Sequence, residues 1–368
     1  MNRNMNRLIK ATRKIPDPRR QWGNLRHKLT DILVIAFCAI ICGAQTYEDL
    51  ELFGKCRKLW LSMYLELPNS IPSADTFQRV FEILDPKSVA KRLRRIIDSD
   101  EILGKIIAFD GKTIRGSKSS EHRAFHILSA YLTDAQIVIG EEIVNEKSNE
   151  ITAIPLLLDE INIEGAVVTI DAMGTQTKIA QKISKKNADY VLALKGNHSD
   201  LHDDVRFYFE NETCFRQKTI KNKSHGRLEK REYSLETQID WLHGSERWMN
   251  LAAIGAAKST VEQKGQKCEE TRYFLTSLTD INRFSEAVRA HWGIENCLHW
   301  HLDVTFGEDE SRFRKGNSAA VWNVLRKTAL EYLKKSDPGK RVSIKSRRRL
   351  AGWDNTYLET ILGVASEK

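Results

Sequence analysis

Three carboxylates in separate segments of the chain have the side chains best suited to chemistry. Asp110 ends the segment IIAFD, Asp171 ends VVTID, and Glu295 lies in HWGIEN. Carboxylate oxygens are the ligands that Mg²⁺ prefers, and a pair of such ions can activate an attacking oxygen and stabilise the leaving oxygen of an in-line displacement. The pattern predicts phosphoryl transfer, with these three residues as the catalytic groups and as the metal ligands of two Mg²⁺ ions, which Mn²⁺ could replace.

The segments around these residues indicate how the carboxylates would be positioned. Each Asp follows a run of apolar and β-branched residues, 106–109 and 167–170, which is typical of a buried strand. Glu295 lies in a helical pattern. The stretch 105–197 has the pattern β-β-β-α-β-α-β, and this is the order of a ribonuclease H-like sheet. In that topology the first and fourth strands are neighbours, so we expect Asp110 and Asp171 to meet.

The whole chain is therefore expected to have an α/β fold: a ribonuclease H-like mixed sheet with an inserted β-rich subdomain and an N-terminal all-helical domain. Five segments are predicted, namely a helical DNA-binding or associated domain at 1–100, the first part of the catalytic core at 101–200, the β-rich insertion at 201–280, the last part of the core with the catalytic Glu at 281–335, and a basic C-terminal tail at 336–368.

Two helices in the first segment can be predicted in more detail. The apolar run 32–44 follows Thr30 and Asp31, which are suited to cap the start of a helix. A second helix is expected after Ser73, with Phe77 and Phe81 on its apolar face. It could be a recognition helix that reads DNA or an amphipathic helix that only packs, because both have the same sequence pattern.

Composition favours a polyanionic partner. The chain has 58 Lys and Arg against 49 Asp and Glu, a formal charge of +9 and a pI of about 9.1. The excess is concentrated in the first 30 residues and in the run Lys340–Arg349, although a basic run can also be only a solvated face. Double-stranded DNA is the expected partner.

Membrane and secretory functions are not expected. The longest apolar run is shorter than the roughly 20 residues that span a bilayer, and the basic first 30 residues lack the apolar stretch of a secretory signal. The six cysteines form no CxxC pair. They fit reduced thiols, so we expect a cytoplasmic protein associated with the nucleoid.

Several motifs in one order carry a family resemblance. FDGKTIRGS, EKSNEITAIPLLL, TIDAMGTQTKIA, YVLALKGNH, KSHGRLEKRE and HWGIENCLHWHLDVTFGEDESRFRKGN resemble segments of the H-repeat-associated proteins, insertion-sequence transposases of the ISAs type with a DDE site. The resemblance implies a ribonuclease H-like core with an inserted β domain, two divalent ions, and DNA cleavage with strand transfer at element ends. It places the three metal ligands at Asp110, Asp171 and Glu295, and by analogy implies a homodimer that pairs two ends.

One departure from related transposases lies around Glu295. Relatives with an inserted β domain carry Arg four residues before this Glu and Lys seven residues after it, where this chain has His291 and Leu302. Histidine is fully charged only below its pKa of roughly 6.5, so its attraction for a phosphate at neutral pH would be weaker than that of Arg.

Other polar residues in the motifs could contact DNA, although each could equally be a plain surface residue. The DNA-binding candidates are Lys112, Arg115, Lys195, Asn197, His225, Arg227, Arg289 and His291. Asp303, Glu308, Asp309 and Glu310 are rivals of Glu295 for the third metal ligand. Two other functions share these features: a ribonuclease H-like nuclease that cuts without strand transfer, and a non-catalytic DNA-binding relic of a transposase.

Overall fold

The computed structural model describes residues 3–20, 25–94, 99–118, 123–144, 149–213, 215–224, 227–263, 266–336, 338 and 342–363, without the side chains of Arg3, Asn4, Ser99, Asp100, Ser224 and Arg227. Its contacts divide the chain into two compact units. The helical unit contains Met1–Ile96, Thr113–His126 and Cys297–Lys368, and the sheet unit contains Ile97–Lys112 and Ile127–Asn296. The five segments expected from the sequence divide the chain more finely and stay predictions.

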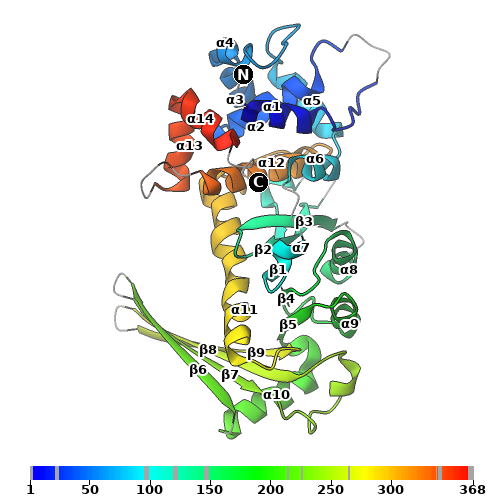
Figure 1. The fold of residues 1–368 in the computed structure, drawn as a ribbon, viewed down its shortest axis with the longest axis vertical. Helices are drawn as coiled ribbons and strands as arrows, with labels where there is room; N and C mark the ends of the chain where they lie inside the picture. The colour runs from blue at the N-terminus through cyan, green and yellow to red at the C-terminus, as the bar shows by residue number, and fades with distance from the viewer. Residues whose placement is uncertain are drawn as a thin grey trace. The chain divides into compact units, whose positions relative to one another are not determined.

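A nine-stranded mixed sheet forms the sheet unit, with the strand order β3-β2-β1-β4-β5-β9-β8-β7-β6 (Figure 1). The strands are β1 (Ile106–Thr113), β2 (His126–Leu132), β3 (Ile137–Val144), β4 (Val167–Ile170), β5 (Asp189–Leu194), β6 (Arg216–Ser224), β7 (Arg227–Glu236), β8 (Ala253–Gln263) and β9 (Gln266–Thr276). Strand β4 is parallel to both β1 and β5. The predicted neighbours, the first and fourth strands, are confirmed.

The inserted strands do not form a sheet of their own. Strand β9 pairs antiparallel with β5, and β8, β7 and β6 follow it in antiparallel order. The β-rich segment thus continues the central sheet, with β6 as its edge. That edge strand carries four cations and no acid, Arg216, Lys218, Lys221 and Lys223; charged edges of this kind oppose pairing with another chain.

Helices cover both faces of the sheet (Figure 1). One face packs against α8 (Glu150–Glu160), α9 (Thr177–Lys185) and α10 (Ser199–Asn211), and the other against α11 (Ile281–Ile294). Side chains alternate along a strand. In β4, Val168 and Ile170 accordingly join the α8–α10 face, while Val167 packs with Phe284 of α11. Burying each such side chain contributes roughly 1.5–3 kcal/mol, which fixes the strand register.

The helical unit contains most of the remaining helices. They are α1 (Arg3–Thr12), α2 (Leu29–Cys42), α3 (Tyr47–Cys56), α4 (Lys58–Leu61), α5 (Ala74–Ile83), α6 (Pro86–Leu93), α12 (Ser318–Lys335), α13 (Ile344–Trp353) and α14 (Asn355–Gly363), while the short α7 (Ser99–Ile102) belongs to the sheet unit.

The predicted cap of α2 is wrong, whereas that of α5 is confirmed. Helix α2 begins at Leu29 after Lys28, with no side-chain cap, and Asp31 is buried in its first turn. Burial raises the pKa of this carboxyl. The Ser73 hydroxyl accepts a bond from the backbone N–H of Thr76 at the start of α5, and Phe77 and Phe81 are fully buried.

The C-terminal segment is not merely a basic polar tail. It folds into α13 and α14, which pack against each other. Helix α13 also packs against α2, and α14 packs against α1. Arg348 is 5 % exposed and donates to the carbonyl oxygens of Ile40, at 2.9 Å, and of Thr305. Arg347 donates to the Leu333 carbonyl at 2.8 Å. Part of the basic run therefore ties helices together.

In the ranges given above, no single helix is long and apolar enough to cross a membrane. Helices α2 and α3, which meet at a bend of 96°, reach the length and apolar composition of a membrane span only when they are taken together. Helix α2 is almost completely buried inside the protein.

Candidate active site

The two aspartates lie at the same point of two neighbouring parallel strands. Phe109 of β1 pairs with Ile170 of β4, so the next pair in this register is Asp110 and Asp171. Phe109 and Ile170 both face α8–α10. Because side chains alternate, Asp110 and Asp171 point to the opposite face, which α11 covers.

Glu295 reaches the same face from the end of α11. The α-helix ends at Ile294, and Glu295–His299 continues as a π-helix, a local widening that is frequent at functional sites. Single carboxylate oxygens of Asp110 and Glu295 lie within 4.8 Å of each other. The structure thus brings two of the predicted carboxylates into one cluster, beside the strand end of Asp171.

A hydrogen bond fixes α11 against β4. His291 Nδ1 lies 2.9 Å from the hydroxyl of Thr169, a side chain on the face of α11 that is 2 % exposed. Thr169 is two residues before Asp171, and His291 is four residues before Glu295. The bond therefore sets the position of the glutamate relative to the strand ends. Sequence reasoning treated His291 as a DNA contact and did not predict this pairing.

Like charges lie close together in the acidic cluster, and the backbone N–H groups and Lys195 offset only part of their effect on the pKa values. Burial raises the pKa of Asp110 to about 8, and the charges of Glu295, Asp171 and Glu150 add to the effect. Burial and Glu150 also raise the pKa of Asp171. Gathered carboxylates that resist ionisation are suited to a divalent cation, whose charge would offset their repulsion.

Glu150 is a further acidic residue that sequence reasoning missed. It begins α8, after the N-cap Asn149, and its charge acts on both aspartates. Glu150 lies in the motif EKSNEITAIPLLL, and this position is the sequence feature that could have indicated its role.

The loop after β4 is held by its own backbone and by residues after β5. Asp171 Oδ1 accepts bonds from the backbone N–H groups of Met173, at 3.1 Å, and Gly174, at 3.3 Å. The amide of Asn197 donates to the Ala172 carbonyl at 2.7 Å. Burial raises the pKa of Asp171, and the charge of the exposed Lys195 offsets part of that rise. Asn197 thus has a structural bond, while Lys195 lies beside the acidic site.

The other DNA-binding candidates are distributed over both units. Lys112 is buried on β1, two residues after Asp110 and on the same face. Arg115 belongs to the helical unit, where its exposed side chain lies 3.8 Å from Asp309. His225 lies outside the described residues, and Arg227 begins β7 but its side chain also lies outside them.

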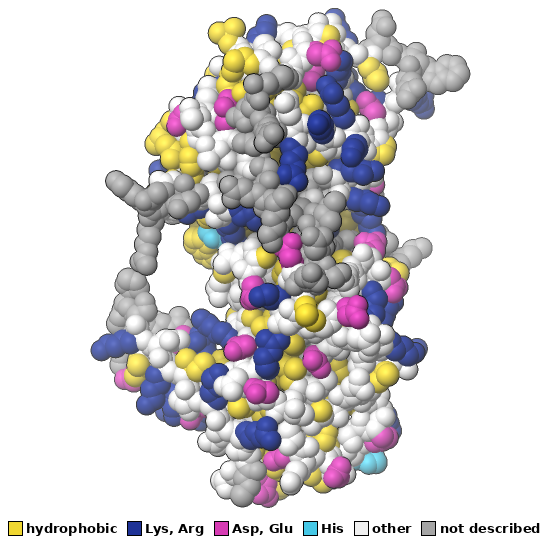
Figure 2. All heavy atoms as spheres, viewed as in Figure 1, with side chains coloured by type: hydrophobic (Ala, Val, Ile, Leu, Met, Phe, Trp, Pro, Cys, Tyr) yellow, Lys and Arg dark blue, Asp and Glu magenta, His cyan; other side chains and the backbone are white. Residues whose placement is uncertain are grey.

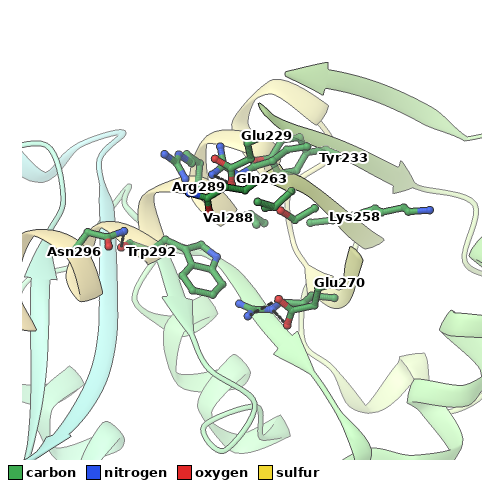
Figure 3. Close-up of a pocket in the computed structure, with 14 residues that line it drawn as sticks. Glu229, Tyr233, Lys258, Gln263, Glu270, Val288, Arg289, Trp292 and Asn296 are labelled. Atoms are coloured by element: carbon green, nitrogen blue, oxygen red, sulfur yellow. Dashed lines mark hydrogen bonds and ion pairs between the residues drawn. The ribbon is translucent and has the colours of Figure 1, made fainter. Parts of the chain in front are cut away.

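A groove of about 680 Å³ lies between α11 and the strands β7, β8 and β9 (Figure 3). Arg289, Trp292 and Asn296 line it from the α11 side, which leads directly to Glu295. The Arg272 guanidinium lies 4.0 Å from the Trp292 ring centre and bonds to Glu270 at 2.7 Å. Lys and Arg side chains also gather over the outer part of these strands (Figure 2). Acids pair with three of the cations in the groove, namely Arg231, Lys258 and Arg272, whereas Arg289 is exposed.

Two of the rival carboxylates have partners within the helical unit. Glu308 is fully buried and accepts a bond from the Asn323 amide at 2.8 Å. Asp309 lies beside Arg115. Both fit structural roles, so neither is needed for the acidic cluster.

A mixed sheet with a large inserted β segment and acidic side chains on one face is consistent with a DDE transposase. Comparison with known families supports this class directly: the family described as "Transposase DDE domain" matches residues 102–331, and its companion described as "DDE_Tnp_1-associated" matches residues 9–97. The chain belongs to the DDE transposase family.

Two relatives resemble the chain over nearly its full length. "Putative transposase YncI" of Escherichia coli O157:H7 is 38% identical over 96% of this chain and 93% of its own. "H repeat-associated putative transposase YhhI" of Escherichia coli strain K12 is 36% identical over 97% and 98%. A shorter relative from strain K12, "Inactive transposase YbfQ", is 40% identical over 21% of this chain and 89% of its own. The predicted family is confirmed.

Proposed function

We propose that this protein is an active insertion-sequence transposase that binds double-stranded DNA at the element ends, cleaves it and joins the freed end to target DNA. The observation that carries the proposal is the strand register, which places Asp110 within β1 next to Asp171 directly after β4, on the face where Glu295 emerges. The core around them is proposed to be ribonuclease H-like, since β1, β4 and β5 are adjacent and parallel.

Asp110, Asp171 and Glu295 are proposed to hold two Mg²⁺ ions, or Mn²⁺ in their place. When bound, such ions activate an attacking oxygen and stabilise a leaving oxygen. The protein's own part is to fix the three carboxylates: the sheet register aligns the aspartates, and the bond between His291 and Thr169 holds the glutamate.

DNA would be held by cations around the cluster. Lys195 lies beside Asp171, and Arg289 is exposed in the groove next to α11. Lys112, Arg115, Asn197, His225, Arg227 and His291 stay candidates for this role. We expect a homodimer when two ends are paired, and a cytoplasmic, nucleoid-associated protein.

The test uses Asp171→Asn with Asp159→Asn as the matched control. Asp159 is an exposed carboxylate of the sheet unit that pairs with Lys182 at 2.5 Å, so its variant makes the same chemical change away from the cluster. A DNA fragment with the inverted repeats that flank the gene is incubated with Mg²⁺ or Mn²⁺, and cuts and joined products are read on a denaturing gel. Wild type and Asp159→Asn should cut and join, whereas Asp171→Asn should bind DNA without cutting it.

Other outcomes would favour the alternatives. Metal-dependent cuts without joined products would indicate a nuclease. Binding by the wild type without any cut would indicate a non-catalytic protein, the state that the name "Inactive transposase YbfQ" gives for that relative. Full cleavage by Asp171→Asn would refute the assignment of the site.

A further inference from the structure

Helix α8 brings a fourth acidic side chain to the neighbourhood of the acidic site in the sheet unit. Glu150 is the first residue of this helix and is half-buried. It belongs to the same unit as both aspartates. Neither the family match nor the names of the relatives assign a role to it.

Two reciprocal hydrogen bonds fix the start of α8. The Asn149 side chain accepts a bond from the backbone N–H of Thr152 at 3.2 Å. The Thr152 hydroxyl accepts one from the backbone N–H of Asn149 at 3.3 Å. This capping box holds the first turn of the helix in one conformation. The backbone of Glu150 therefore has a defined position.

Close packing places this first turn beside the loop that carries Asp171. Residues four apart are neighbours on a helix surface, so Glu150 and Ile154 lie on the same side of α8. Ile154 lies against Gly174, where a Cβ would be 2.5 Å from the Ile154 Cδ1 atom. The backbone N–H of Gly174 donates to Asp171 Oδ1 at 3.3 Å. A continuous set of contacts thus links the turn of Glu150 to Asp171.

A second close approach holds the other end of α8 against the sheet. A Cβ at Gly140 of β3 would lie 2.6 Å from Leu157 Cδ1 and 2.7 Å from Ile161 Cγ2. Both α8 side chains are buried. Because glycines allow the helix to approach the sheet at two places, α8 cannot tilt without losing buried contacts. Glu150 accordingly keeps its place relative to the sheet.

The negative charge of Glu150 acts on both aspartates. Burial is the main cause of the raised pKa values of Asp110 and Asp171, and the charge of Glu150 adds to the rise in each. Like charges held near one another destabilise the metal-free protein, and a divalent cation would reverse this effect. The partial positive charge at the start of α8 offsets part of the repulsion.

We propose that Glu150 is a fourth acidic residue of the metal site and increases its affinity for divalent cations. The inference rests on the proposed function, because it takes the three other carboxylates as metal ligands. Mg²⁺ keeps several of its waters when it binds to proteins. A carboxylate beside the direct ligands can accept hydrogen bonds from such waters and add negative charge to the site.

The experiment measures binding of Mn²⁺ alone to the full-length protein, from the electron paramagnetic resonance signal of the free ion. Glu150→Gln is compared with Glu164→Gln, which makes the same change at an exposed position after α8. Removal of a partner beside the direct ligands typically weakens metal binding about 10- to 100-fold. Glu150→Gln should therefore lose at least about 10-fold in affinity, and Glu164→Gln should bind as the wild type does. Glu150→Asp keeps the charge and should retain most of the affinity.

Thermal unfolding distinguishes this role from a purely structural one. In EDTA, Glu150→Gln should unfold about 1–2 °C higher than the wild type, because repulsion of the aspartates is relieved. Added Mn²⁺ should raise the unfolding temperature of the wild type more than that of the variant. A glutamate that only stabilises the helix start would show the reverse pattern, a lower unfolding temperature in EDTA with unchanged Mn²⁺ affinity.

A further variant, Asp171→Asn, separates failure of this inference from failure of the proposed function. If Asp171→Asn loses Mn²⁺ binding while Glu150→Gln binds like Glu164→Gln, the role of Glu150 is refuted and the proposed metal site stands. If the wild type binds no Mn²⁺, or Asp171→Asn binds it as tightly as the wild type, the proposed metal site is wrong, and the role of Glu150 fails with it.

Discussion

The bond between His291 and Thr169 gives the most direct test of how the fold positions the acidic site. Thr169→Val keeps the shape of the side chain and its preference for a strand, and removes only the oxygen that faces His291 at 2.9 Å. Because Thr169 is buried on β4, the half-buried imidazole would lose this hydrogen bond on the side that faces the sheet.

The expected magnitudes differ for stability and for cleavage. Loss of one buried hydrogen bond lowers the free energy of unfolding by about 0.5–1.5 kcal/mol, and leaving the partner unsatisfied can raise this to about 3 kcal/mol. A displacement of about 1 Å at a catalytic group can reduce the rate about 100-fold. We therefore expect a modest loss of stability with a disproportionate loss of cleavage, while DNA binding stays near that of the wild type.

The matched control is Thr276→Val on β9. Thr276 is also fully buried, donates to the Tyr190 carbonyl at 2.7 Å and accepts from the backbone N–H of Leu278. Its variant should lose as much stability without the added loss of cleavage. Stability is measured by urea unfolding, and cleavage by the single-turnover rate at a temperature where both variants are folded.

A double-mutant cycle completes this test. Thr169→Val, His291→Phe and the double variant should show a coupling in the cleavage barrier of at least about 0.5 kcal/mol, as expected for residues in contact. Additive effects, or equal cleavage by Thr169→Val and Thr276→Val, would refute the idea that this bond positions Glu295.

Two further predictions concern stability alone. In urea unfolding, Gly316→Ala should lower the free energy of unfolding by about 2 kcal/mol or more, because the residue has positive φ and a Cβ would meet the Glu82 carbonyl. The control is Gly293→Ala near the end of α11, where the space around the residue is open. It should be neutral or stabilising by up to about 1 kcal/mol. Burial lowers the pKa of His301 to about 4, so the folded protein binds fewer protons than the unfolded chain between about pH 4 and pH 6.5. Stability in urea unfolding should therefore fall as the pH falls through this window, and His301→Gln should lose that part of the pH dependence.

The central architecture was predictable because its signals are local. The runs 106–109 and 167–170 are apolar and β-branched, and both form strands with fully buried side chains at those positions. The order of strands and helices then predicted the pairing of β1 with β4, which the register confirms. Strand β6 was missed because it is strongly polar and lacks such signals. Helix α1 lies in the segment that was expected to be helical, and it packs against α14, α2 and α6.

The candidate site was predictable only in part, for a related reason. The apolar runs before Asp110 and Asp171 indicated two buried strands, and Asp171 directly follows β4 as expected, whereas β1 continues past Asp110 to Thr113 because the polar residues after it still pair in the sheet. The bond between Thr169 and His291 and the influence of Glu150 depend on which faces of distant elements meet. A threonine in a strand and a glutamate at the start of a helix both have ordinary local explanations. Only the folded structure shows that Thr169 and Glu150 act on the candidate site.

The basic run near the C-terminus shows why charge counts overestimate DNA contacts. Of its four described cations, Arg347 and Arg348 are occupied by carbonyl oxygens within the helical unit, and only Lys345 and Arg349 are exposed. Since each phosphate contact contributes about 0.9 to the salt slope, these four residues can supply at most about 1.8 rather than 3.6. Lys345→Gln/Arg349→Gln should lower the slope by up to that amount with little change in stability. Arg348→Gln should instead lower the free energy of unfolding by about 2–4 kcal/mol, because two carbonyls lose a charged donor, and leave the slope unchanged. A slope that falls for Arg348→Gln but not for the exposed pair would reverse this assignment and make the buried arginine a DNA contact.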